Sequence, residues 1–259
     1  MQAAQNLSHP RYWLIPAAAV LALAGVIGAG ANRELFLAIN RLGLAGGDVL
    51  WANVTALGDT LILLALAAPF IGRRPDIVIA VMITTLITAL AVHGLKALLA
   101  LPRPPAVLPA EAFHLIGPDH KSGAFPSGHS AAAFAFAGVL SLKYRHSVIT
   151  AALLLAAGAV GVSRVMVGVH WPADVLAGAA VGWLCAVAGV LLAARRSARD
   201  VPGRIELIVA VPLLLAAGIL LWPGATGYED TVVLQYSVAA VGLAGGITGL
   251  ARIVRRDHP

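Results

Sequence analysis

The stretch DIVIAVMITTLITALAVHGLKALLAL, residues 76–101, is apolar along almost its whole length and carries Lys96 near its end. A helix needs about 20 mostly apolar residues to cross a bilayer, and this stretch exceeds that length. A charged side chain is unfavourable in the hydrocarbon region, so Lys96 is expected close to a membrane face. A charge kept in a spanning helix despite this cost also suggests a functional role. Residues 76–101 therefore predict a membrane-spanning helix with a basic group at its carboxyl end.

Similar apolar runs lie on both sides of this one. Of the 259 residues, 59% are hydrophobic and 12% are charged, against about 25% charged in a typical soluble domain. Seven or eight segments in all approach a spanning length. Besides 76–101 they are 12–30, 57–72, 127–142, 147–168, 173–194, 205–222 and 231–251, with 57–72 and 127–142 the weakest. The predicted fold class is all-α, a polytopic transmembrane helical bundle.

The beginning of the chain contains two segments that need interpretation. The first apolar run follows Arg11 and is about 18 residues long, longer than the 7–15 of a signal-peptide core, so an uncleaved helix is expected. In residues 32–56, Leu35, Phe36 and Ile39 recur at helical spacing. They fit a short helix in the membrane interface, and an ordinary connecting loop fits as well.

The basic residues indicate how the helices are oriented. The net charge is +6, but no basic stripe or nucleic-acid-binding motif is present, so nucleic acid is excluded as the expected partner. With a cytoplasmic N-terminus and eight spans, twelve of the 18 Lys and Arg residues are cytoplasmic, including those in the run Arg195-Arg196-Ser197-Ala198-Arg199. The positive-inside rule favours this topology, which also places the C-terminus in the cytoplasm.

Three polar segments stand out in this apolar chain. They are Lys96-x6-Arg103-Pro104, Pro126-Ser127-Gly128-His129 and Ser163-Arg164-x5-His170-x3-Asp174. In the eight-span topology all three fall at the outer membrane face. Several cations close together indicate a binding site for an anion. Phosphate is a suitable anion, because Arg can contact it through two N–H groups and Lys through a point charge. Helices expected to begin at Ser127 and Pro172 would add free N–H groups and partial positive charge.

Each segment alone is a weak signal, because a Lys-x6-Arg pair at a helix end is usually a snorkelling pair. Together, in this order and on one face, they resemble the type 2 phosphatidic acid phosphatase (PAP2) superfamily at every defining position. The resemblance covers residues 90–180 directly. It implies a six-helix core, which we place in a domain of residues 1–200, with residues 201–259 forming an additional C-terminal two-helix hairpin and a basic tail.

The resemblance also implies a role for each motif residue. His170 would attack phosphorus to form a phosphohistidine, and Asp174 would orient it. His129 would protonate the leaving oxygen and then activate water. The phosphate would be bound by Lys96, Arg103, Ser127, Gly128 and Arg164. No cofactor and no metal are expected, because fixed cations would stabilise the charge and the chain lacks a carboxylate cluster for Mg²⁺.

Three further polar residues are secondary candidates. His93 lies three residues before Lys96 on the same helix face, where it either tunes the site or is a hydrogen-bonded interior histidine. Lys121 either contacts a second phosphate or lies in a solvated loop. Asp59 is a candidate partner for a cation of the site.

The predicted function is an integral membrane phosphatase acting on a lipid phosphate or pyrophosphate at the outer face of a bacterial inner membrane. Candidate substrates are undecaprenyl pyrophosphate, phosphatidylglycerol phosphate, phosphatidic acid and lipid A phosphates. Two alternatives are a phosphotransferase that uses an acceptor lipid such as lipid A, and a non-catalytic lipid-binding or transport protein. The expected partners are the lipid substrate and the bilayer, and the oligomeric state stays open.

Overall fold

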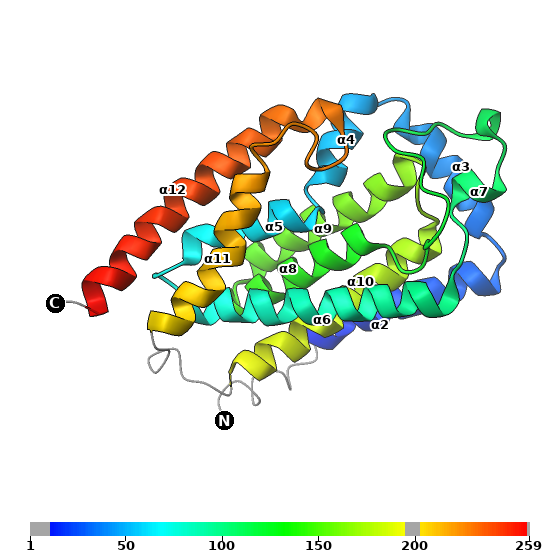
Figure 1. The fold of residues 1–259 in the computed structure, drawn as a ribbon. Coiled ribbons are helices and arrows are strands. Elements are labelled where there is room, and N and C mark those ends of the chain that lie inside the picture. Colours follow the sequence, from blue (N-terminus) through cyan, green and yellow to red (C-terminus); the bar gives the residue numbers. More distant parts are fainter. Residues whose placement is uncertain (1–10, 195–202, 258–259) are drawn as a thin grey trace.

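The computed structural model describes residues 11–194 and 203–257, and this part of the chain is all-α. Long helices run side by side, and short helices and a long loop gather at one end of the bundle (Figure 1). In chain order the helices are α2 (Arg11–Gly28), α3 (Asn32–Gly43), α4 (Asp48–Ala56), α5 (Thr60–Ala67), η1 (Ala68–Phe70), α6 (Pro75–Leu99), α7 (Pro104–Val107), η2 (Ala110–Ala112), α8 (Gly128–Tyr144), α9 (Ser147–Met166), α10 (Pro172–Ala193), α11 (Gly203–Ile219), η4 (Glu229–Thr231) and α12 (Val232–Asp257).

Length and apolarity decide which of the described helices can cross a membrane. Four candidates pass by themselves: Pro75–Val107, Ser147–Met166, Pro172–Ala193 and Glu229–Arg256. Two bent pairs, α2 with α3 and α4 with α5 and η1, pass jointly and raise the number to six. Helices α8 and α11 have 17 residues each, one fewer than the 18 residues taken here as the shortest spanning helix. The described chain is therefore a polytopic helical membrane protein with four to six candidate spans.

The two bends lie in the amino-terminal part of the bundle. Residues Asn32–Gly43 form the helix α3, so the prediction of a short helix at the start of residues 32–56 is confirmed and that of a plain loop is wrong there. Helix α3 turns away from α2 by 109°. Helices α4 and α5 meet at 57°, at Gly58-Asp59. The Asp59 carboxylate caps α5 by accepting a hydrogen bond from the Leu61 N–H at 2.8 Å, so the bend is stabilised locally.

Helix α10 lies in the interior of the bundle and packs against α2, α6 and α8. The buried Trp183 on α10 donates a hydrogen bond from Nε1 to the Tyr12 carbonyl oxygen at 2.7 Å. A Cβ atom on Gly178 of the same helix would lie 2.6 Å from the Ser127 carbonyl oxygen. The backbones of α8 and α10 therefore approach closely, as small residues allow between membrane helices.

The last two helices pack on the rest of the bundle through α5 and η1. A Cβ atom on Gly242 of α12 would lie 2.8 Å from the Ala65 carbonyl oxygen, and one on Gly245 would lie 2.8 Å from the Pro69 Cα. Arg73 donates to the Gly245 carbonyl oxygen at 3.0 Å. The proposed domain boundary at residue 200 and the basic residues Arg195, Arg196 and Arg199 lie outside the described residues.

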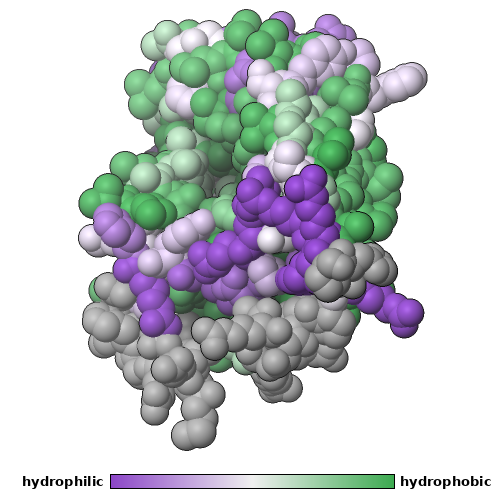
Figure 2. Space-filling model, turned by 90° about the vertical axis from the view of Figure 1, so that its left-hand side faces the viewer, coloured by the Kyte–Doolittle hydropathy of each residue, from purple (hydrophilic) through white to green (hydrophobic). Residues whose placement is uncertain are grey.

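The end of the bundle where α12 finishes is charged. Arg74 pairs with Asp76 at 3.0 Å, Lys143 pairs with the same carboxylate at 3.3 Å, and Arg256 pairs with Glu206 at 2.9 Å. Figure 2 looks onto this end, and hydrophilic residues gather in the lower half of the view, with a mostly apolar region above them. Because α3 and α7 lie at the other end in Figure 1, the bundle separates this charged end from the end that contains the three motifs.

Candidate active site

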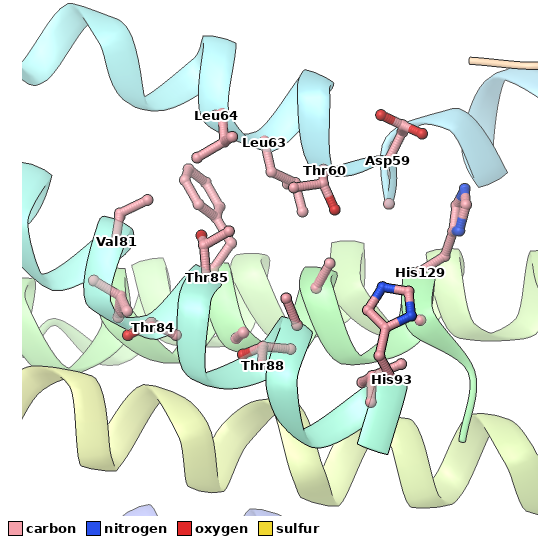
Figure 3. Close-up of a pocket in the computed structure, with 18 residues that line it drawn as sticks. Asp59, Thr60, Leu63, Leu64, Val81, Thr84, Thr85, Thr88, His93 and His129 are labelled. Atoms are coloured by element: carbon pink, nitrogen blue, oxygen red, sulfur yellow. The ribbon is translucent and has the colours of Figure 1, made fainter. Parts of the chain in front are cut away.

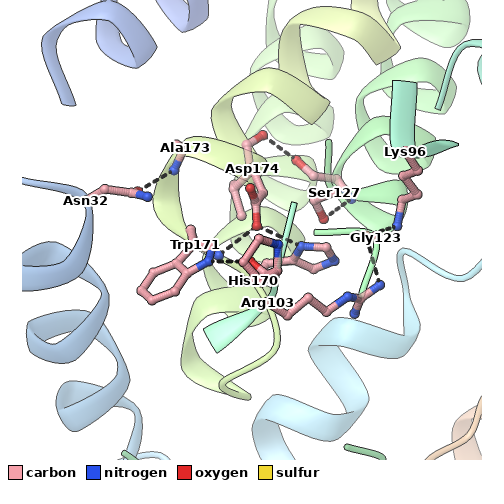
Figure 4. Close-up of polar contacts among 12 residues, drawn as sticks. Asn32, Lys96, Arg103, Gly123, Ser127, His170, Trp171, Ala173 and Asp174 are labelled. Carbon is pink, nitrogen blue, oxygen red and sulfur yellow. Dashed lines mark hydrogen bonds and ion pairs between the residues drawn. The ribbon is translucent and has the colours of Figure 1, made fainter. Parts of the chain in front are cut away.

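The first motif ends α6 and folds the following loop back over it. Lys96 Nζ, in the last turn of α6, donates to the Gly123 carbonyl oxygen at 2.7 Å. Arg103 Nε donates to the Ser122 carbonyl oxygen at 2.9 Å, and its Nη2 lies 3.4 Å from the Gly123 oxygen (Figure 4). Both cations therefore hold the loop that leads into the second motif.

The second motif starts α8, as the sequence predicts. Ser127 is the N-cap residue, is fully buried, and accepts a hydrogen bond from the Ser130 N–H through its Oγ at 3.4 Å. Its own N–H donates to the Asp174 carbonyl oxygen at 2.9 Å. The Ser130 hydroxyl donates to the Val175 carbonyl oxygen at 2.9 Å. The beginnings of α8 and α10, each with free N–H groups, are thus joined directly.

His170 and Asp174 form a buried pair at the start of α10. The His170 Nδ1 and Asp174 Oδ2 atoms are 3.1 Å apart, and the same oxygen accepts from the Trp171 N–H at 2.9 Å (Figure 4). Both residues are at most 3% exposed. The carboxylate therefore selects the tautomer with the proton on Nδ1, which leaves the lone pair on Nε2.

Burial and charge keep His170 neutral. His170 lies between α9 and α10 and its pKa is lowered well below the usual value, first by burial and then by Arg164, Arg103 and Lys96. A neutral imidazole is the form that can attack an electrophile. The three cations therefore favour the nucleophilic form of His170 as well as a bound anion.

Arg164 enters the same end of the bundle from the last turn of α9 and is 3% exposed. Its Nη1 donates to the Thr55 Oγ1 at 2.7 Å and to the Tyr228 hydroxyl at 3.0 Å. Its Nε is buried and has no hydrogen-bond partner among the described residues. A buried donor without a partner is unfavourable, so this Nε is a candidate contact for a bound group.

His129 lies in the first turn of α8 and also has an unsatisfied buried atom, Nε2, among the described residues. It lines a cavity of about 180 Å³ between α5, α6 and α8, together with His93 and Asp59 (Figure 3). A Cβ atom on Gly58 would lie 3.0 Å from the His129 Cβ. The glycine therefore lets the break between α4 and α5 come close to this histidine.

The three secondary candidates have different positions. His93 is exposed, so the prediction of an interior histidine is wrong, and its ring lines the cavity beside His129. Lys121 is 67% exposed and pairs with Asp119 at 3.7 Å, as in a solvated loop. The Asp59 carboxylate caps α5 and lines the cavity, and no ion pair joins it to a cation of the described chain.

Several residues of the site were not found from the sequence. Thr55 and Tyr228 contact Arg164, and the Asn32 side chain accepts a hydrogen bond from the Ala173 N–H at 3.0 Å. The buried Asn40 accepts from the His114 N–H at 2.8 Å and donates to the Met166 carbonyl oxygen at 2.9 Å. The one signal available in the sequence is shared by these residues: in the eight-span topology Asn32, Asn40, Thr55 and Tyr228 all fall in connections expected at the outer face.

His120, in the loop between α7 and α8, is exposed but interacts electrostatically with the same cations. Its pKa is lowered by partial burial and then by Arg103, Arg164 and Lys96. Ser163 is buried and donates to the Val160 carbonyl oxygen of its own helix at 2.7 Å. The positive field of the site therefore reaches the loop, whereas the Ser163 hydroxyl is satisfied within α9.

The fold and this end of the bundle define a class: a helical integral membrane protein with a cluster of buried cationic and histidine side chains at one end. The chain belongs to the PAP2 superfamily, whose profile matches residues 77–198. It is similar to the solved structure of Aquifex aeolicus LpxE, with 32% identity and a TM-score of 0.57 over 62% of this chain and 94% of that one.

A second solved structure supports the fold. It is the first transmembrane PAP2 type phosphatidylglycerolphosphate phosphatase from Bacillus subtilis, with a TM-score of 0.53 and 23% identity over 71% of this chain and 98% of that one.

Among characterised proteins, the chain is 41% identical over 73 residues to the lipid A 1-phosphatase of Rhizobium johnstonii (27% of this chain, 28% of the relative). It is 40% identical over 76 residues to phosphatidylglycerophosphatase B of Escherichia coli K12 (28% of this chain, 30% of the relative). These matches thus span less than a third of the relatives.

Proposed function

We propose that the chain is an integral membrane phosphatase that hydrolyses a lipid phosphate or pyrophosphate through a phosphohistidine. One observation carries the proposal. The Nδ1 of His170 is held by Asp174 at 3.1 Å, and the same end of the bundle contains two buried nitrogen atoms without partners in the described chain, Arg164 Nε and His129 Nε2. A fixed nucleophile at the same end as an unpaired guanidinium donor and an unpaired ring nitrogen is suited to phosphoryl transfer, which depends on positioning and charge stabilisation.

In the proposed reaction, His170 Nε2 attacks phosphorus and forms an N–P bond while the bond from phosphorus to the lipid oxygen breaks. His129 gives its proton to that oxygen. His129 then takes a proton from water, which attacks phosphorus and releases phosphate and neutral His170. Before this, the bound phosphate would favour protonated His129 by adding negative charge beside the cations. Lys96, Arg103 and Arg164 supply the positive charge, so the proposed reaction needs no metal.

The cavity beside His129 supports a lipid substrate. Apart from Asp59, His93 and His129, its wall consists of apolar and threonine side chains and glycines, mostly from α5, α6 and α8, and these helices are largely apolar. We expect the phosphate to lie near His129 and His170 and a lipid chain to extend between these helices. The names of the relatives make lipid A 1-phosphate and phosphatidylglycerophosphate the first substrates to test.

The test is a phosphate-release assay on purified protein with lipid A 1-phosphate, phosphatidylglycerophosphate, phosphatidic acid and undecaprenyl pyrophosphate. His170→Ala serves as the blank. Release from at least one lipid, inhibited by vanadate and unchanged by EDTA, is expected. Transfer of label to an acceptor lipid would favour the phosphotransferase instead. Loss of activity in EDTA that Mg²⁺ restores would rule out the metal-free reaction.

We also propose a topology. The bundle would cross a bacterial inner membrane eight times, with the motif end outside and both termini in the cytoplasm, as the distribution of basic residues favours. The basic groups Arg74, Lys143 and Arg256 at the end opposite the motifs support this orientation. A reporter fused after Arg256 is expected to be cytoplasmic, and an external signal there would contradict the proposal.

A further inference from the structure

The guanidinium of Arg164 is held by residues that belong to none of the three motifs. Its Nη1 donates to Thr55 on α4 and to Tyr228 in the connection between α11 and α12. Both of its Nη1 hydrogens are then used. The remaining donors are Nε and Nη2, which form one edge of the planar fork and suit a bidentate contact with phosphate. The buried Nε, unpartnered in the described chain, lies on that edge.

Tyr228 is fixed in position by its surroundings. Its side chain is 5% exposed and packs with Ala52, Ile116 and Val167. The neighbouring loop passes the ring at Gly117, whose φ of 82° and lack of a Cβ atom permit the close approach. The ring therefore has little room to turn, and its hydroxyl stays directed at Arg164.

The backbone of the same connection is held by a buried set of hydroxyl and amide groups. The Thr231 hydroxyl donates to the Tyr228 carbonyl oxygen at 2.6 Å. Gln235 Nε2 donates to the Thr231 Oγ1 at 2.7 Å and to the Thr226 Oγ1 at 3.0 Å. All three polar side chains are at most 7% exposed. The connection therefore presents Tyr228 from a rigid support.

The connection that carries Tyr228 lies outside the region that matches the PAP2 superfamily, because that region ends at residue 198. In Figure 1 the connection between α11 and α12 lies beside α4, and η4 packs against α4. The close packing of Gly242 and Gly245 on α5 and η1 fixes α12 to the bundle. The added hairpin therefore brings a hydroxyl into the site that the motifs alone do not contain.

We propose that Tyr228 is a positioning residue: with Thr55, it holds Nη1 of Arg164 so that the Nε and Nη2 edge faces the phosphate. The inference rests on the proposed function. A side chain that positions a cation for the transition state should affect kcat and the binding of a transition-state analogue. A side chain that only supports the fold should affect the amount and stability of folded protein.

Tyr228→Phe tests this directly, because it removes the hydroxyl and keeps the ring. Hydrogen bonds to charged groups contribute enough to predict a fall of about 10- to 100-fold in kcat. Orthovanadate affinity, measured by calorimetry, should fall in parallel, while KM should stay within about twofold. Tyr236→Phe is the matched control, since Tyr236 lies on α12 and is 40% exposed, and it should behave as wild type.

Thr55→Val examines the same Nη1 from α4 and should lower kcat and vanadate affinity in the same way. It decides the question if Tyr228→Phe does not fold. If the variant that folds has the kcat and vanadate affinity of the wild type, the inference is overturned. A change in KM alone would overturn it as well. If the wild type releases phosphate from no lipid, the proposed function fails, and the vanadate affinities then decide the inference by themselves.

Discussion

On one side of the site, Asp174 in the first turn of α10 contacts the His170 ring and accepts a hydrogen bond from the Trp171 N–H, both just before that helix. On the other side, Arg164 depends on Thr55 and Tyr228, which lie 109 and 64 positions away in the chain. The His170 side is thus built by a few consecutive residues, and the Arg164 side by helices packing together. The difference indicates that the first side should tolerate changes elsewhere in the bundle, whereas the second should respond to them.

The largest expected effect comes from the local side. His170→Ala removes the proposed nucleophile and should lower kcat by about 10³-fold or more without unfolding the protein. Two quantities are measured with the best lipid substrate: the phosphate that is released, and the burst of phosphohistidine that forms on the protein. His146→Ala, an exposed histidine at the start of α9, is the control. A burst in His170→Ala would assign the nucleophile to another residue.

A smaller effect is expected on the assembled side. Arg164→Lys keeps the charge but cannot bind two hydroxyls and a phosphate with one planar fork, so kcat/KM should fall about 10²-fold. Arg145→Lys, an exposed change at the other end of the bundle, should have no effect. Equal activity of Arg164→Lys and wild type would show that the fork geometry is unimportant.

Acidic pH should act on the local side first. Folding lowers the pKa of His170 through burial and the neighbouring cations, so this histidine stays neutral below its unfolded value of about 6.5. The acid limb of kcat/KM should therefore lie below pH 6.5. Because the unfolded chain binds more protons there, stability should fall as the pH drops below about 6.5. An acid limb for His170 phosphorylation above pH 6.5 would contradict this.

The smallest effect should come from the hairpin packing that supports Tyr228. Gly245→Leu forces a side chain against Pro69 and should destabilise the protein by about 1–3 kcal/mol, with a loss of activity below tenfold. Gly218→Leu on α11, where a Cβ atom would meet no other atom within 4 Å, is the matched control. Equal melting temperatures of the two variants would show that α12 is only loosely packed.

The predictable parts of the molecule follow from local physics. Ser127 as an N-cap and Pro172 at the first helical position start α8 and α10 where the sequence indicates, because both signals act within one turn. The runs of apolar residues likewise give the long helices. The sequence indicates a short helix within residues 32–56 but does not give the 109° angle between α2 and α3 or the separate α4.

The contacts of Arg164 could not be predicted from the sequence either. Thr55 and Tyr228 have no spacing relation to the motifs, and they meet only after α4, α9 and the α11–α12 connection have packed. His93 is a second case, since its spacing placed it on the helix face of Lys96 and left an interior position open, whereas α6 leaves it exposed beside the cavity. Sequence spacing gives a helix face, and packing decides what that face meets.

The bond from the Ser127 N–H to the Asp174 carbonyl oxygen, with the close approach at Gly178, has a mechanical consequence. It clamps α8 to α10, so His129 and His170 must move together and their separation stays fixed. A bulkier or slimmer lipid then has to be accommodated by the opposite wall, where the chain bends between α4 and α5 at Gly58-Asp59. Tolerance for different lipids would therefore evolve through α5 and α6, with the two histidines left undisturbed.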